Sequence, residues 1–492
     1  MKRFKQISEA ARFMIIMLFA TLVFPSCDKK LEPEPDAVTV NIATIQGVTN
    51  PVTGATPTAT VTETEQYTGA VTWTPAVSET FAAGTEYTAT ITLTAKSGFT
   101  FIGVAENFFT VDGVLTVRNA ANSGIVTAKF HATDMKSGTA GKLTWKITSD
   151  GTLIIGGTGD MPDYESIYEG KWIIASTAPW FEYRNLFTAV MIEDGITSIG
   201  SYAFILCSNL TSAIIGNSVR SIGYAAFYDC SNLASVITGN SIESIELYAF
   251  WNCVSLLEFT IPNSVTTVKP SAFNGCSSLT SVTIPSSVVS IGETAFSNCD
   301  GLMSINVDAG NSAYCSENGV LFDKAKTELI QYPARKTGAY IIPESVGFIE
   351  IFAFRGCKGL TEVTIPKSVI YMGQEAFTGC SNLNTVYFNA VNCRDMGYVG
   401  KWAVVSYVFS GCNKITTVHI GSEVTKIPCY AFYNCSGLQE IINQSAIPQE
   451  IGIDVFYKVD KATCTLRVPA ASIEAYRKAD DWKDFVNIVA IE

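Results

Sequence analysis

A pattern of three hydrophobic residues recurs every 23 residues through the second half of the chain. Each cysteine of the series follows a phenylalanine by three positions and precedes a leucine or isoleucine by three. The cysteines are Cys207, Cys230, Cys253, Cys276, Cys299, Cys357, Cys380, Cys412 and Cys435. The phenylalanines are Phe204, Phe227, Phe250, Phe273, Phe296, Phe354, Phe377, Phe409 and Phe432. Such regularity predicts a protein built from stacked structural repeats.

One unit, residues 279–299, indicates how each repeat folds. Leu279, Val282 and Ile284 have the spacing of the strand half of a leucine-rich repeat, with the apolar side chains facing inward. Pro285 is expected to end this strand, because proline has no N–H to donate to a ladder.

The rest of the unit is expected to close the coil. Val288 and Ile291 predict a second inward edge, and Gly292 a tight bend. Phe296 and Cys299 then complete the turn. No single unit can bury its apolar edge, so the units must stack about 4.8 Å apart into a solenoid whose core holds ladders of identical side chains.

Residues 38–133 have a different, strand-like pattern. In residues 87–95, apolar side chains alternate with threonine, and Gly-containing turns interrupt this and similar runs. Short strands at such spacing predict a β-sandwich. The segments Trp73–Pro75, Phe99–Phe101 and Phe108–Val111 resemble Ig-like modules of bacterial surface proteins. Trp73 is expected in the core, with a sugar-stacking platform as the alternative.

The 23-residue pattern closely resembles the BspA-type leucine-rich repeat family, also called LRR_5, over about residues 135–492. The resemblance implies a mainly β fold with a β-hairpin cap at 135–192, repeats at 193–445 and an α/β cap at 446–492. A hairpin is expected over residues 143–155, the first strand of the repeats at 189–193, and a short helix at 472–478. Caps are needed because terminal coils would otherwise expose the core.

Two spacings depart from 23 residues and predict insertions near 308–342 and 390–405. The first contains two apolar runs, 318–322 and 328–333, that indicate an extra hairpin. Insertions in solenoids loop out on one face, where they either bind a partner or only decorate the coil.

The first 26 residues have the features of an export signal. Basic residues precede a 12-residue apolar run, Phe13 to Phe24, which is too short to span a bilayer as a helix. Phe24-Pro25-Ser26-Cys27 resembles a bacterial lipobox, with Phe24 where leucine is usual. Cys27 is therefore the predicted lipid attachment site, and residues 27–37 are a polar tether. An ordinary signal peptide with an incidental cysteine is the alternative.

The composition limits the chemistry. The chain has 492 residues, 33 Lys+Arg against 45 Asp+Glu and a formal charge of −12, which suits nucleic acid poorly. It has only two histidines, His131 and His419, which leave little room for zinc catalysis or a Ser-His-Asp relay. We expect no catalytic residue, metal or cofactor, and a monomer. A pair of acidic residues for glycoside hydrolysis stays open.

Fourteen cysteines in an exported chain would ordinarily suggest disulfides. The nine in the ladder should instead be small buried hydrophobes whose parallel Cβ vectors suit a disulfide poorly. We expect free thiols there, and any disulfide among Cys315, Cys393, Cys429 and Cys464.

The candidate binding strip is the residue seven positions after each ladder cysteine, which should project from the exposed face of the stacked sheet. The strip is Ile214, Ile237, Thr260, Thr283, Asn306, Thr364, Tyr387, His419 and Ile442. Its apolar and aromatic members, at the two ends, either anchor a protein partner or pack under caps and insertions.

Together these features predict an exported protein, lipid-anchored to the outer membrane and facing the cell surface. The family resemblance implies a non-catalytic, adhesin-like module whose ligands are proteins such as those of the extracellular matrix. One alternative is glycan capture for nutrient uptake, with Trp73, Tyr387 or Trp402 as stacking platforms. A purely structural envelope protein is the other.

Overall fold

The computed structural model describes residues 37–396 and 407–492. The predicted signal peptide, Cys27 and nearly all of the tether lie outside the described residues, as does most of the expected insertion at 390–405. The described residues form two compact units. The first comprises residues 37–49, 58–74 and 88–129, and the second comprises residues 50–57, 75–87, 130–396 and 407–492.

The N-terminal unit is built on a four-stranded sheet in the order β2-β3-β6-β5, in which β3 is antiparallel to both neighbours. The strands are β2 (Tyr67–Thr74), β3 (Thr88–Ala95), β5 (Val114–Asn119) and β6 (Ile125–Phe130). A small parallel pair joins β1 (Val38–Thr39) to β4 (Phe99–Thr100). The alternation predicted for residues 87–95 is confirmed, since Ala89, Ile91 and Leu93 are buried.

Trp73 differs from the expectation of a core position. Its side chain is half-buried, and its indole N–H donates to the carbonyl oxygen of Thr58 at 2.8 Å. A strand-end position near solvent leaves only part of the ring covered, so the prediction of full burial is wrong.

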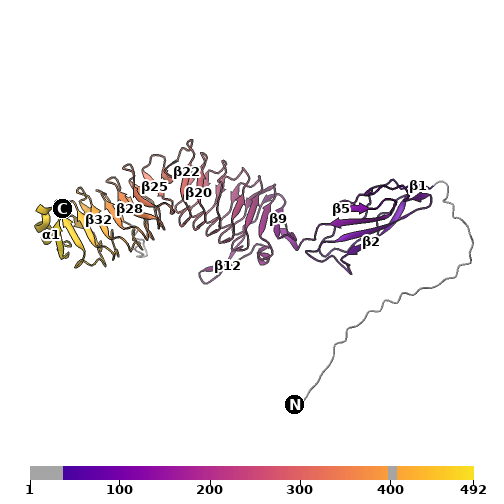
Figure 1. The fold of residues 1–492 in the computed structure, drawn as a ribbon, viewed down its shortest axis with the longest axis horizontal. Helices are drawn as coiled ribbons and strands as arrows, with labels where there is room; N and C mark the ends of the chain where they lie inside the picture. Colours follow the sequence, from indigo (N-terminus) through magenta and orange to yellow (C-terminus); the bar gives the residue numbers. More distant parts are fainter. Residues whose placement is uncertain (1–36, 397–406) are drawn as a thin grey trace, which may run out of the picture. The chain divides into compact units, whose positions relative to one another are not determined.

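The second unit is a β-solenoid in which strands of successive coils lie side by side in parallel (Figure 1). The longer strand of each coil joins one face, which is divided into three sheets. The first sheet holds β7 (Lys136–Ala140), β8 (Leu143–Ile147), β9 (Thr152–Gly156), β13 (Ala189–Ile192), β15 (Ser212–Ile215) and β17 (Ser235–Ile237). The second holds β20 (Ser281–Ile284) and β22 (Ser304–Val307). The third holds β26 (Gly338–Ile341), β28 (Leu360–Ile365), β30 (Thr385–Phe388), β32 (Thr417–Ile420), β34 (Glu440–Asn443), β36 (Thr465–Val468) and β37 (Asn487–Ala490).

Short strands form the second inward edge of the coils. One series is β10 (Gly159–Asp160), β14 (Ile196–Ile199), β16 (Ser221–Ile222), β18 (Ser244–Ile245), β19 (Thr267–Val268) and β21 (Ser290–Ile291). Later coils contribute β25 (Glu328–Gln331), β27 (Phe348–Ile349), β29 (Tyr371–Met372), β31 (Asp395–Met396), β33 (Lys426–Ile427) and β35 (Glu450–Ile451). The caps and insertion add β11 (Ser166–Glu169), β12 (Trp172–Ser176), β23 (Tyr314–Glu317), β24 (Val320–Asp323), the 3-10 helices η1 (Phe181–Tyr183) and η2 (Ala470–Ser472), and α1 (Ile473–Lys478).

Several predicted details of the solenoid are present. The first-cap hairpin pairs β8 with β9, and the extra hairpin of the insertion pairs β24 with β25. The short helix of the second cap is α1. The hydrophobic core divides near this insertion into one cluster that extends to Leu321 and another that begins at Val320.

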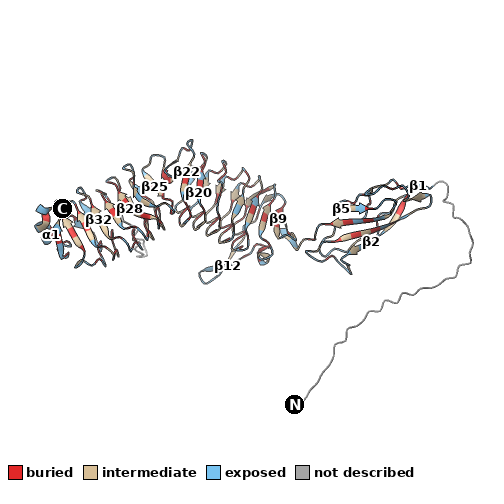
Figure 2. Cartoon of the chain, viewed as in Figure 1, coloured by how far each residue is buried: buried red, intermediate tan, exposed pale blue. Residues whose placement is uncertain are grey.

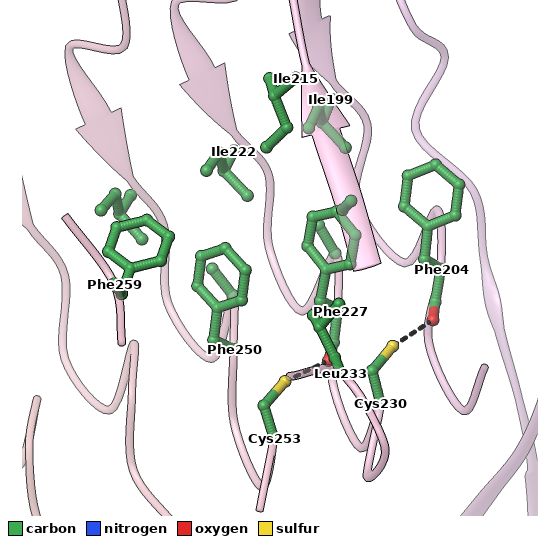
Figure 3. Close-up of a cluster of buried hydrophobic side chains, with 14 of the residues drawn as sticks. Ile199, Phe204, Ile215, Ile222, Phe227, Cys230, Leu233, Phe250, Cys253 and Phe259 are labelled. Atoms are coloured by element: carbon green, nitrogen blue, oxygen red, sulfur yellow. Dashed lines mark hydrogen bonds between the residues drawn. The ribbon is translucent and has the colours of Figure 1, made fainter. Parts of the chain in front are cut away.

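The phenylalanine ladder runs through the core as stacked rings (Figure 3). The rings of Phe227 and Phe250 lie 5.2 Å apart at an interplanar angle of 2°, and those of Phe354 and Phe377 lie 4.4 Å apart at 14°. The first cap adds Trp180, stacked 5.7 Å from Phe204, and the last coil adds Phe456, stacked 6.0 Å from Phe432. The caps therefore continue the ladder rather than merely cover it.

Phe259 interrupts the long-strand face. It occupies the position that Val236 and Val282 hold one coil before and one coil after, and no strand of the long-strand face forms between β17 and β20. Its ring lies 5.0 Å from that of Phe250 and 4.9 Å from that of Phe273. A ring in place of a small aliphatic group needs more room inside the coil, which accounts for the break in pairing.

Gly292 has a second role, which lies in the packing of adjacent coils. Its φ is not positive, but a Cβ there would lie 2.2 Å from the backbone nitrogen of Pro270 in the preceding coil. The glycine therefore permits close approach of two coils, and the expected tight bend stays a prediction.

The ladder cysteines are buried, and none forms a disulfide. Most of their thiols donate to the carbonyl oxygen of the ladder phenylalanine one coil earlier. Cys230 Sγ lies 3.0 Å from the oxygen of Phe204, and Cys253 Sγ lies 3.2 Å from that of Phe227 (Figure 3). The position therefore requires a small side chain with a weak donor, which explains cysteine better than size alone.

The other cysteines are varied in their surroundings. Cys315 Sγ donates to the carbonyl oxygen of Asp323 at 3.2 Å, and the sulfur of Cys429 accepts from the N–H of Ile453 at 3.3 Å. Cys393 and Cys464 are buried. Cys315, Cys429 and Cys464 carry free thiols.

The native chain is expected to keep its nine ladder thiols unmodified by iodoacetamide at pH 8. Burial raises the pKa of Cys207 and of Cys299 to about 12 and that of Cys253 well above its ordinary value, so no reactive thiolate forms. Intact-mass measurement after unfolding without reductant should then show at least nine alkylated thiols. Fewer than nine, or rapid ladder labelling of the native chain, would contradict this assignment.

Candidate binding surface

The outer face of the long strands aligns the predicted strip residues by register. Ile214 on β15 pairs with Ile237 on β17, and Thr283 on β20 pairs with Asn306 on β22. Buried and exposed residues alternate along these strands, as the banded colouring in Figure 2 shows. None of the nine strip residues is buried.

The N-terminal end of the strip is apolar and open to solvent. Ile214 is 43% exposed and Ile237 is 60% exposed, so neither is covered by a cap. Register adds Met191 on β13 and Ile154 on β9, both half-buried. Four neighbouring strands thus present a continuous row of large apolar side chains.

A cavity of about 370 Å³ lies beside this row on the first cap. Lys146 and Glu193 line it together with Ile154. The ammonium group of Lys146 lies 3.7 Å from the carboxylate of Asp134. The row is therefore bordered by charged groups of both signs, an arrangement typical of protein-binding patches with a polar rim.

The middle of the strip is polar. Thr260 lies in the coil without a long strand, and Thr283, Asn306 and Thr364 carry small polar side chains. Ile341 on β26, which is 72% exposed, pairs with Thr364. It was missed because the coil that precedes it has no ladder cysteine from which to count.

The C-terminal end of the strip is aromatic and half-buried. The rings of Tyr387 and His419 stack 4.3 Å apart at 17°, so each covers one face of the other. Burial lowers the pKa of His419, against the opposing influence of the Glu440 and Glu362 carboxylates. His419 is therefore mostly uncharged at neutral pH, which suits the stacking.

The strip continues into the second cap. Ile442 pairs with Arg467 on β36, and Arg467 pairs with Val489 on β37. The guanidinium of Arg467 forms an ion pair with Glu440. These cap residues could not be found by counting from a ladder cysteine, but their strands keep the register of the coils.

Of the proposed glycan platforms, Tyr387 has one face covered by His419, Trp73 belongs to the N-terminal unit, and Trp402 lies outside the described residues. In the described ranges, no three His, Cys, Asp or Glu side chains gather into a group that could hold a metal ion. Among the same residues, no helix is long and apolar enough to cross a bilayer.

Away from the strip, one glutamate of a carboxyl pair has a strongly raised pKa. A hydrogen bond with Glu350, followed by burial and charge repulsion, raises the pKa of Glu328 to about 8. Glu328 therefore keeps its proton in the folded chain at a pH where the unfolded chain has lost it. The stability that this group contributes is complete below about pH 4 and is lost as the pH rises through about 8.

Glu328→Gln is expected to remove this pH dependence. The amide keeps a hydrogen bond to Glu350 without a titrating proton, so the melting temperature of the variant should decline less between pH 5 and 9 than that of the parent. Thermal unfolding at a series of pH values checks this, with Glu344→Gln as an exposed control. Parallel curves for the parent and Glu328→Gln would disprove the coupling.

Comparison with known proteins agrees with this architecture. The model for "BspA type Leucine rich repeat region" matches six copies, over residues 178–314, 334–398 and 403–477. No functionally curated protein matches the chain significantly in sequence.

Several solved structures are similar to this chain. A leucine-rich repeat protein from Eubacterium ventriosum is 27% identical, with a TM-score of 0.55, over 70% of this chain and 91% of that one. A leucine-rich cell surface protein from Faecalibacterium prausnitzii is 25% identical, with a TM-score of 0.43, over 73% and 95% of the two chains. A leucine-rich repeat protein from Bacteroides ovatus is 20% identical, with a TM-score of 0.38, over 71% and 98%.

Proposed function

Because the chain belongs to the BspA-type leucine-rich repeat family, we propose that it is a cell-envelope protein whose solenoid binds other proteins without catalysing a reaction. The observation that carries this proposal is the exposed apolar row Ile154, Met191, Ile214 and Ile237 on one sheet face. Large apolar side chains aligned on a rigid surface are typical anchors of protein–protein interfaces.

The ligands that this function takes are host or neighbouring-cell proteins, among them proteins of the extracellular matrix. The strip supports a protein rather than a small molecule because it is long and open, with anchors at both ends and a polar middle. We propose that the chain acts as a monomer.

The same proposal includes a lipid anchor and a spacer. Cys27 follows an export signal and carries the lipid, so that the chain is held at the outer membrane and faces the cell surface. Residues 38–133 serve as an Ig-like spacer, which the four-stranded sheet with antiparallel pairings supports. Protease treatment of intact cells tests the orientation, since an inward-facing chain would be protected.

Replacement of Cys27 by alanine is expected to abolish lipid attachment and to release the chain from the membrane fraction. The thiolate of Cys27 is the proposed acceptor, and alanine offers no atom for acylation. Labelling with radioactive palmitate and cell fractionation measure both effects, with Cys315→Ala as the control that keeps its label. Retained label on Cys27→Ala would refute the anchor without bearing on the solenoid.

The binding proposal itself is tested with the purified full chain over immobilised fibronectin and fibrinogen. Saturable binding to either supports it. Binding to neutral glycans but to neither protein would favour glycan capture, and binding to none of them would favour a structural envelope protein.

A further inference from the structure

A cluster of five aromatic side chains lies on the turn edge of the solenoid, away from the strip. They come from three successive coils, of which the first contributes one ring and the next two contribute two each. They are Tyr202, Tyr224, Tyr228, Tyr248 and Trp251. All five are half-buried, so part of each ring faces solvent.

The rings have two kinds of arrangement. The ring of Tyr224 lies 5.1 Å from that of Tyr202 and 5.9 Å from that of Tyr248, nearly perpendicular to both. The rings of Tyr228 and Trp251 stack 4.4 Å apart at 11°. The cluster therefore offers a ligand both the faces of aromatic rings and their edges, and the tyrosine edges carry hydroxyl groups.

These rings, together with Ile173 on β12, line an open cavity of about 270 Å³. The β11–β12 hairpin that carries Ile173 also holds Tyr168, 56% exposed, and Trp172, 78% exposed. This volume is near the lower end of small-ligand sites, which span about 300–1,000 Å³. It suits one compact ring rather than a long peptide.

The backbone near the cavity is already occupied by hydrogen bonds between coils. The N–H of Tyr202 donates to the oxygen of Tyr224 at 2.9 Å, and the N–H of Ala225 donates to that of Leu247 at 3.0 Å. A ligand must therefore be recognised by ring faces and tyrosine hydroxyls, which argues against an added β-strand.

The lining contains no ionisable side chain other than tyrosine. Burial is the main influence that raises the pKa of Tyr224 to about 12, so its hydroxyl stays protonated at neutral pH. Each such hydroxyl both donates and accepts hydrogen bonds. The site thus offers apolar faces and neutral polar groups, which match a ligand with C–H faces and hydroxyl edges.

We propose that this cavity binds a neutral pyranose ring of a glycan, a site distinct from the protein-binding strip and independent of it. The sugar ring stacks its C–H face on an aromatic ring, and its hydroxyls pair with those of Tyr224 and its neighbours. Tyrosine and tryptophan suit a site that is partly exposed to solvent, because each combines an apolar ring with a hydrogen-bonding O–H or N–H group.

Calorimetric titration of the full chain with chitohexaose, cellohexaose and maltohexaose tests this site. At least one of the three is expected to bind. Trp251→Ala should weaken that affinity about tenfold or more, since an aromatic anchor is lost. Tyr224→Phe, which removes only a hydroxyl, should weaken it by a smaller factor while leaving the melting temperature within about 2 °C of the parent's.

Tyr433→Ala is the matched control. Tyr433 precedes its ladder cysteine by two residues, as Tyr228 and Trp251 do, but its ring stacks between those of Tyr407 and Tyr457 at 3.8 and 4.7 Å. Its removal is expected to leave sugar affinity unchanged.

Three results would overturn the proposal. The first is that none of the three sugars gives a heat of binding at 10 mM. The second is that a sugar binds but neither Trp251→Ala nor Tyr224→Phe weakens its affinity. The third is that only a proline decamer or choline, titrated in the same way as comparison ligands, binds to the chain. Because the strip does not include these residues, fibronectin binding by Trp251→Ala should remain, which separates this outcome from that of the proposed function.

Discussion

Phe250→Ala is expected to lower the free energy of unfolding of the solenoid by about 3–5 kcal/mol. The Phe250 side chain is fully buried, and its ring lies 5.2 Å from those of Phe227 and Phe273. Alanine would leave a cavity between two stacked neighbours that the coil spacing holds in place. Because each coil is stable only against its neighbours, the loss affects both sides.

Urea unfolding followed by circular dichroism measures this loss. Phe348→Ala is the matched control, since the Phe348 side chain is 45% exposed on β27 and its loss should cost under about 1 kcal/mol. Equal destabilisation by the two variants would show that the phenylalanine ladder does not support the fold.

The paired substitution Ile214→Asp and Ile237→Asp is expected to weaken binding of a protein partner at least about 30-fold. The two side chains are adjacent in register and exposed, so carboxylates there would face any apolar partner surface directly. The fold should survive, because neither side chain belongs to the core. A biosensor with immobilised fibronectin and fibrinogen measures the change.

Ile453→Asp is the control for this pair. Ile453 is 64% exposed but lies on a turn, outside the long-strand face. It adds one of the two negative charges that the pair adds, leaves the strip unchanged and should leave affinity for the partner unchanged. If Ile453→Asp weakened affinity for the partner as much as the pair does, the cause would be general charge repulsion in an acidic chain.

Much of the solenoid could be predicted because its core positions recur. Phe, Cys and Leu occupy fixed places in each coil, so one unit's inward residues define those of all the others. The start of the ladder at Trp180 and its end at Phe456 could not be found in this way. Tryptophan replaces phenylalanine at the start, and Val459 replaces the cysteine that should follow Phe456 by three positions.

Contacts between coils were less accessible from sequence. The thiol of Cys230 donates to the carbonyl of Phe204, a bond that depends on the exact stacking of two coils. Gly292 and Phe259 likewise act through their neighbours in adjacent coils, one by close approach and one by bulk. The 23-residue spacing of the pattern predicts none of these contacts between coils.

The strip was predicted only where a ladder cysteine precedes the strand. Register extends it to Ile154, Met191 and Ile341, and into the second cap at Arg467. The aromatic cavity was missed because its tyrosines lie in turns, where no apolar period marks them. Tyrosine or tryptophan next to the ladder phenylalanines, as in Tyr224 to Tyr228, was the available signal.

Binding of the unmodified full chain to immobilised fibronectin and fibrinogen is the most direct test of the central claim, which is that the solenoid holds protein ligands. Our account predicts saturable binding to at least one of them, with a Kd of about 10 µM or below. No saturable binding to either protein at concentrations up to about 100 µM would contradict it.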